Sequence, residues 1–166
     1  LMAPLLDRAD HVFDTSRLTV ADLRLAIDGT FAREGGPPIT ISVASFAFRR
    51  GLPREADLVL DVRFLINPHY IEDLRDKTGL DQEVVDYVKT DTDFEGFFAR
   101  LCAMVIPLLP RYTAEGKRYL TIAIGCTGGR HRSVVVAEQL AGRLTEAGHK
   151  VRVRHRDLME SPNHPQ

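Results

Sequence analysis

Tryptophan is absent from this sequence of 166 residues, and cysteine occurs only twice, at Cys102 and Cys126. Two cysteines are too few for a disulfide framework, which favours a reducing, cytoplasmic setting. No apolar run approaches the roughly 20 residues that are needed to span a bilayer. The first residues also lack the basic-then-apolar layout of a secretory signal. We therefore expect a cytoplasmic protein with no membrane partner.

The net charge is also close to zero, because the sequence contains 22 Lys and Arg residues and 23 Asp and Glu residues. A basic surface for nucleic acid, if the chain has one, must therefore be local. Hydrophobic residues make up 44% and charged residues 27% of the chain, which excludes wholesale disorder. The length fits one domain with a real core.

Three motif classes are missing. No Gly-x-x-x-x-Gly-Lys-Ser/Thr segment occurs, so this chain carries no P-loop for a nucleotide. His69, His131, His155 and Cys126 lack the spacing of a metal site, and we expect no metal. Residues 155–158 read His-Arg-Asp-Leu like a kinase catalytic loop, but no glycine-rich loop or Asp-Phe-Gly accompanies them. We expect no cofactor in this chain.

The segments that are present alternate between strand and helix patterns. Apolar or alternating runs predict strands at residues 39–46, 57–63, 119–125 and 150–156. Helical periodicity lies between them, at residues 81–88, from residue 93 past Leu108, and at residues 133–147. Pro107 and Pro110 are expected to kink or shorten the middle helix. Strands separated by helices predict an α/β fold with a layered, largely parallel sheet.

The first residues read differently from the rest. A short strand is predicted at residues 9–15 and a helix at 18–32, before a Gly-Gly-Pro-Pro break. Because the sequence opens inside a periodic pattern, we expect residues 1–36 to be the tail of a preceding domain; a small βα unit packed on the main domain is the alternative. The main domain is expected at residues 37–158, followed by a flexible tail at 159–166.

A glycine-rich loop at residues 125–133, Gly-Cys-Thr-Gly-Gly-Arg-His-Arg-Ser, lies between the third predicted strand and the helix after it. Glycines allow a tight turn that points backbone N–H groups inward, and the helix presents its positive end to the loop. Arginine and histidine side chains adjoin it. The loop therefore predicts a site for a phosphate or carboxylate; a plain turn whose arginines face solvent is the alternative.

The same loop has the spacing of the cysteine phosphatases, in which five residues separate a cysteine from an arginine followed by serine or threonine. Here these are Cys126, Arg132 and Ser133. Cys126 would be the nucleophile, Arg132 would clamp the phosphate, and Asp61 or Asp157 would be the general acid. The alternative is that Cys126 is a small buried residue at the end of a strand. We favour a non-enzymatic domain.

Other candidate residues follow the first two predicted strands. Ligands of parallel sheets bind at the carboxyl ends of the strands, so Asp61, Arg63 and His69 are expected near the glycine-rich loop, as are Arg49 and Arg50. We interpret His69 as a candidate ligand-binding group. Asp61 either binds the ligand or holds a neighbouring arginine.

The fourth predicted strand is basic at every second position, which places its cations on one face. This pattern indicates either an edge strand protected against aggregation or a stripe that binds phosphate backbones. Aromatic residues do not alternate with the cations, so a structured RNA fits better than a single strand. The candidate RNA-binding residues are Arg49, Arg50, Lys150, Arg152, Arg154 and Arg156.

Several long motifs, in the same order, resemble the C-terminal domain of the RapZ/YvcJ family of bacterial nucleotide-binding and RNase adapter proteins. The resemblance covers residues 39 to 158. It is carried by Ser45-Phe46-Ala47-Phe48, by Asp61-Val62-Arg63-Phe64-Leu65 with Asn67-Pro68-His69-Tyr70, by Thr78-Gly79-Leu80-Asp81, by the glycine-rich loop and by His155-Arg156-Asp157-Leu158. Arg130 departs from the family, which usually has glutamine there, and would add charge to the pocket.

The resemblance implies a phosphorylated amino sugar, such as glucosamine-6-phosphate, as the ligand, and small regulatory RNA and an endoribonuclease as partners. It implies self-association into a homo-oligomer. It assigns ATP and GTP to an N-terminal P-loop domain of which residues 1–36 would be the end. The expected ligand-binding residues are Asp61, His69, Cys126, Thr127, Gly128, Gly129, His131, Arg132 and Ser133.

Overall fold

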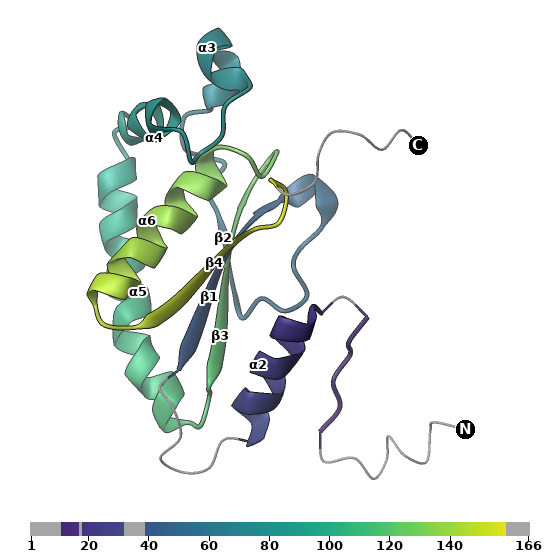
Figure 1. The fold of residues 1–166 in the computed structure, drawn as a ribbon. Coiled ribbons are helices and arrows are strands. Elements are labelled where there is room, and N and C mark those ends of the chain that lie inside the picture. Colours follow the sequence, from purple (N-terminus) through teal and green to yellow (C-terminus); the bar gives the residue numbers. More distant parts are fainter. Residues whose placement is uncertain (1–10, 17, 32–38, 159–166) are drawn as a thin grey trace.

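The computed structural model describes residues 11–16, 18–31 and 39–158. Its core is a four-stranded sheet with the strand order β2-β3-β1-β4, in which every neighbouring pair is parallel (Figure 1). The prediction of an α/β fold with a parallel sheet is thereby confirmed. The strands are β1 (Thr40–Ala47), β2 (Leu58–Asp61), β3 (Tyr119–Cys126) and β4 (Lys150–His155).

The two long strands, β1 and β3, form the centre of the sheet. They pair over their whole lengths, from Thr40 opposite Tyr119 to Ala47 opposite Cys126. Ile41, Ile122 and Ile124 are completely buried. Because all strands run in the same direction, the ends of β1, β2 and β3 meet at one edge, where the glycine-rich loop also lies.

Two helices, α5 (Phe94–Ala114) and α6 (Arg132–Glu146), cover one face of the sheet (Figure 1). Val136, Leu140 and Leu144 of α6 are fully buried, and each burial of this kind contributes about 1.5–3 kcal/mol. The shorter helices α3 (Glu72–Arg75) and α4 (Gln82–Lys89) lie beyond the carboxyl end of the sheet. No helix in the described ranges is long and apolar enough to cross a membrane.

The opposite face of the sheet carries α2 (Val20–Phe31), on the side away from α5 and α6 (Figure 1). The connection from β1 to β2 contains the short helix η1 (Phe48–Arg50), and η2 (Pro68–Tyr70) follows β2. The side chains of this sheet face that lie near α2 are small or polar, such as Ser42, Ala44 and Thr121. The two faces are therefore chemically unlike.

The strand predicted at residues 9–15 is wrong for residues 11–15, which form no strand; residues 9 and 10 lie outside the described ranges. The carboxylate of Asp14 instead accepts hydrogen bonds from the N–H and hydroxyl groups of Ser16, at 3.0 and 2.6 Å. This local bonding makes a turn and competes with strand pairing.

Of the two effects expected of proline, a kink or a shorter helix, the shortening is wrong, because α5 continues through Pro107 and Pro110 to Ala114. Both prolines lie on the exposed side of the helix. The carbonyl groups that lose their partners there can bond to water, which reduces the cost of proline in a helix. On the other side, Leu101 and Leu109 are buried in the core and hold the helix in place.

The segment Thr78-Gly79-Leu80-Asp81 packs against the first turn of α6, and this close approach yields a prediction. A Cβ atom at Gly79 would lie 2.7 Å from Val134 Cβ and 2.8 Å from Val135 N, whereas a Cβ at Gly142 inside α6 meets nothing within 4 Å. We expect Gly79→Ala to destabilise the protein by about 1–3 kcal/mol, as overpacking does. Gly142→Ala, the matched control, should stabilise it by about 0.5–1 kcal/mol. Urea unfolding measures both, and equal effects would contradict the packing described here.

Candidate functional site

A cavity of about 460 Å³ opens at the carboxyl end of β3, beside the start of α6. Its volume suits a small molecule. Side chains from four segments line it: those around η1, around η2, at the end of α3 and in the glycine-rich loop. The lining residues are Arg49, Asn67, His69, Arg75, Asp76, Cys126, Thr127, Gly128, Arg130, His131 and Arg132.

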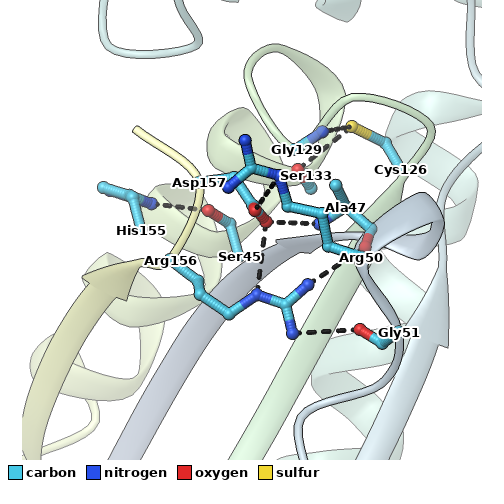
Figure 2. A network of polar contacts seen from close by, with 10 residues as sticks. All are labelled: Ser45, Ala47, Arg50, Gly51, Cys126, Gly129, Ser133, His155, Arg156 and Asp157. Carbon is cyan, nitrogen blue, oxygen red and sulfur yellow. Dashed lines mark hydrogen bonds and ion pairs between the residues drawn. The ribbon is translucent and has the colours of Figure 1, made fainter. Parts of the chain in front are cut away.

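Gly129 fixes the shape of the loop. Its φ is +70°, a left-handed conformation that favours glycine. A Cβ atom there would lie 2.9 Å from both Ala47 N and Asp157 Oδ2, so the loop could not approach the end of β1. The Gly129 N–H donates to Cys126 Sγ at 3.2 Å, and Ser133 Oγ lies 3.1 Å from the same sulfur (Figure 2). The thiol thus ties the two ends of the loop together.

Below the loop lies the carboxylate of Asp157, whose side chain is only 2% exposed. It accepts the N–H of Ala47 at 2.6 Å and forms ion pairs with Arg50 at 3.3 Å and Arg156 at 3.4 Å (Figure 2). Arg156 also donates to the carbonyl groups of Gly51 and Ala47. Two guanidinium groups thus balance one buried charge and join the ends of β1 and β4.

A second polar chain joins the same elements. Ser45 Oγ lies 2.9 Å from His155 Nδ1, and His155 Nε2 lies 2.8 Å from Glu138 Oε1 on α6. The order serine, histidine, carboxylate resembles a hydrolase triad, but Ser45 is completely buried. A nucleophile must reach its substrate, so we assign these residues to holding β1, β4 and α6 together.

Arg132 is the most deeply placed cation of the cavity, with 5% of the residue exposed. Its Nη1 donates to the carbonyl oxygens of Arg63 at 2.7 Å and Leu65 at 3.0 Å, and Nη2 donates to Thr127 Oγ1 at 3.4 Å. Nε is buried without a hydrogen-bond partner. A buried donor without a partner is costly in free energy.

His131 lies beside Arg132 and is 8% exposed, and its Nε2 is likewise buried without a partner. Burial lowers the pKa of His131 below the usual 6.5 and the nearby Arg130 lowers it further, whereas hydrogen bonding to the backbone of Lys77 and Arg75 opposes the shift. The imidazole is therefore neutral at pH 7. A negative charge next to the ring would stabilise the protonated imidazole and so raise the pKa of His131.

The outer part of the cavity is lined by residues from separate segments. His69 and Asn67 come from η2 and its cap, Arg75 and Asp76 from the end of α3. Arg130 donates to the carbonyl oxygen of Asp76 at 3.2 Å. Sequence reasoning missed Arg75 and Asp76 entirely and gave Asn67 no role. No local signal connects α3 with the glycine-rich loop.

The structure brings most of the predicted ligand-binding residues together at this cavity, with three exceptions. Gly129 and Ser133 do not line the cavity, and instead hold the loop in shape through their contacts with Cys126 Sγ. Asp61 lies outside the lining residues, where it accepts three hydrogen bonds from the Arg63 guanidinium at 2.6–3.0 Å. These bonds lower the pKa of Asp61. Asp61 is expected from the sequence either to bind the ligand or to hold a neighbouring arginine, and the geometry agrees with the second role.

The six predicted RNA-binding residues divide into three places. Arg49 lines the cavity, while Arg50 and Arg156 bind Asp157. Lys150, Arg152 and Arg154 are exposed on β4, which is an edge strand of the sheet. No group of three potential metal-binding side chains occurs among the residues that the structure describes.

Comparison with known proteins adds an independent finding. The RapZ C-terminal domain family matches residues 39–159. A nucleotide-binding protein of Rhodospirillum rubrum is 56% identical over 162 residues, which is 98% of this chain and 51% of that protein. Similar proteins of the same description from Rhodospirillum centenum and Acidiphilium cryptum are 55% and 53% identical, over 95% of this chain and 48% and 52% of their own lengths.

The chain thus spans about half the length of the curated relatives it matches. The matched region begins one residue before β1 and includes the glycine-rich loop, the cavity and the Asp157 network. Together, the fold, the site and these similarities place the chain in the RapZ family, as a member with that family's C-terminal domain.

Proposed function

We propose that this domain is a non-enzymatic sensor that binds a phosphorylated amino sugar, such as glucosamine-6-phosphate, in the cavity at the start of α6. One observation carries the proposal: Arg132 and His131 both line this cavity, both are more than nine-tenths buried, and each has a buried side-chain nitrogen without a hydrogen-bond partner. The start of a helix and three further arginines, Arg49, Arg75 and Arg130, favour an anion there.

The cavity also offers hydrogen-bond acceptors, because the side chains of Asp76 and Asn67 line its wall. A sugar phosphate offers the complementary groups, since its phosphate suits the cations and its hydroxyl or amino groups suit the acceptors. The cavity thus supports a ligand that is anionic at one end and a donor at the other.

We further propose that the exposed cations of β4 bind small regulatory RNA, that the protein presents this RNA to an endoribonuclease, and that it acts as a homo-oligomer. Lys150, Arg152 and Arg154 support the proposed contact with RNA, because exposed cations in a row suit a phosphate backbone. The relatives bear the name nucleotide-binding protein, and we assign ATP or GTP to the half of them that this chain does not span.

A cysteine-dependent phosphatase is the second candidate function, favoured by the contacts of Cys126 Sγ with Gly129 N and Ser133 Oγ. Neither acid considered for it matches the role. Asp61 has a lowered pKa and is held by Arg63, and Asp157 is buried beneath the loop. A general acid instead needs a raised pKa and access to the leaving group. These positions favour binding without turnover.

A phosphorus NMR titration with glucosamine-6-phosphate tests the sensor and its rival together. We expect the ligand signal to shift with the wild-type protein, and Arg132→Lys to weaken binding at least about tenfold because the forked donor is lost. Cys126→Ser should bind almost as the wild type does. Unchanged affinity in a folded Arg132→Lys variant would contradict the assigned phosphate contact. Growth of an inorganic phosphate signal that Cys126→Ser abolishes would make the protein an enzyme.

The lowered pKa of His131 predicts how binding depends on pH. Free His131 is neutral above its pKa, which lies below 6.5, and a bound dianion favours the protonated ring. Affinity for sulfate, whose charge is constant here, should therefore rise as the pH falls from about 7.5 to 5.5, with uptake of up to one proton. Calorimetry in buffers of different ionisation enthalpy measures this proton. His131→Asn should flatten the dependence, and His149→Asn, which removes a histidine outside the cavity, serves as the control; an equal slope in His131→Asn would disprove the link.

RNA binding by β4 predicts a change in salt dependence. Each phosphate contact contributes about −0.9 to the slope of log affinity against log salt, so replacing Arg152 and Arg154 with glutamine should reduce the slope by about 1–2 and weaken binding of an RNA stem-loop. A control pair, Lys89→Gln with Arg111→Gln, removes two exposed cations from α4 and α5. Filter binding over a salt series gives the slopes. Equal slopes for the two double variants would contradict the RNA site.

A further inference from the structure

The sheet face under α2 is unusually polar for a face that a helix covers. A cavity of about 360 Å³ lies between α2 and this face and is lined by Ser42, Ala44 and Thr121 of the central strands. Thr121 is 1% exposed, and its hydroxyl oxygen is buried without a hydrogen-bond partner. A permanently covered sheet face normally carries close-packed apolar side chains and no unpartnered hydroxyl.

Two apolar side chains of α2 are largely exposed to solvent. Val20 and Ile27 of α2 are 75% and 39% exposed, whereas Leu140 and Leu144 of α6, on the other side of the sheet, are fully buried. The ion pair from α2 to the sheet joins Asp22 to Arg154 of β4 at 3.6 Å, with side chains 27% and 45% exposed. An exposed pair of this kind changes an equilibrium by no more than about fivefold.

The charged residues around this face come from two parts of the structure, the α2 segment and the sheet with its loops. Four acidic residues line the cavity, and Asp14 and Asp22 belong to the α2 segment, while Glu55 and Asp57 belong to the sheet. The cations that line this cavity and its neighbour, among the side chains that the structure describes, belong to the sheet and its loops: Arg54, Lys117, Arg152 and Arg154. Asp57 is paired with Lys117 at 2.7 Å. Removal of α2 would therefore leave a polar face with a clear excess of positive charge.

We propose that α2 is a removable cover over this face, and that a polyanion bound to the exposed Arg152 and Arg154 displaces it and gains contact with the polar side chains beneath. The inference rests on the proposed binding of RNA by β4 and extends it, because it makes α2 a competitor of the RNA. The apparent affinity for the polyanion is then reduced by the fraction of molecules in which the cover is closed.

Hydrogen exchange of the α2 amides tests the displacement, with inorganic polyphosphate as a polyanion that has no sequence. We expect saturating polyphosphate to speed exchange in residues 20–31 while leaving α6 unchanged. Bound polyphosphate with unchanged or slower exchange in α2 would overturn the proposal, as would the absence of any polyphosphate binding. An RNA stem-loop is measured in parallel: if polyphosphate opens α2 but the stem-loop does not bind, the RNA function fails and the removable cover stands.

Asp22→Asn provides the matched variant, with Asp86→Asn on α4 as the control for loss of one negative charge. Asp22 also accepts the N–H of Thr19 at 3.0 Å and so caps α2, but asparagine keeps this acceptor. We expect Asp22→Asn to raise polyphosphate affinity on the order of threefold and Asp86→Asn to leave it nearly unchanged. The gain should shrink when Arg154 is replaced by glutamine. Equal gains for the two aspartate variants would contradict a specific role for the Asp22–Arg154 pair.

Discussion

Asp157 places a negative charge where almost no water reaches, and three parts of the chain converge on it. The N–H of Ala47 fixes the end of β1, Arg50 fixes η1, and Arg156 fixes the end of β4. The glycine-rich loop then rests on this carboxylate, with room for Gly129 but for no side chain. A buried charge of this kind is stable only with all of its partners in place. The shape of the cavity therefore depends on residues that do not line it.

Two polar side chains of the cavity, Arg132 and His131, are held in place by the protein itself. Arg132 is held by the carbonyl groups of Arg63 and Leu65, so its guanidinium does not have to be ordered on binding. His131 stands beside it in the neutral form. This arrangement has a cost in the folded protein. Below pH 6.5 the unfolded chain takes up the proton more readily than the folded one, so His131 reduces stability as the pH falls through that range.

The parts of the structure that the sequence predicted are those with local signals. Apolar alternation located the four strands of the sheet, and the glycine-rich loop stands out by composition alone. The misassigned strand at residues 11–15 shows the limit, because a strand also needs a neighbour, and Asp14 bonds to Ser16 instead. Arg75 and Asp76 reach the cavity only through tertiary packing. The role of Asp157 as a buried anchor is likewise invisible in the sequence around it, which reads as a loop.

The strand order also governs how the chain assembles during synthesis. Strand β1 is made early, yet both of its neighbours, β3 and β4, follow much later in the sequence. Its apolar residues Ile41, Val43 and Phe46 thus stay without their sheet partners until most of the domain has left the ribosome. Distant pairings of this kind slow folding and expose strand edges to aggregation. The last strand closes the sheet, so the glycine-rich loop gains its support from Asp157 only after β4 has been made.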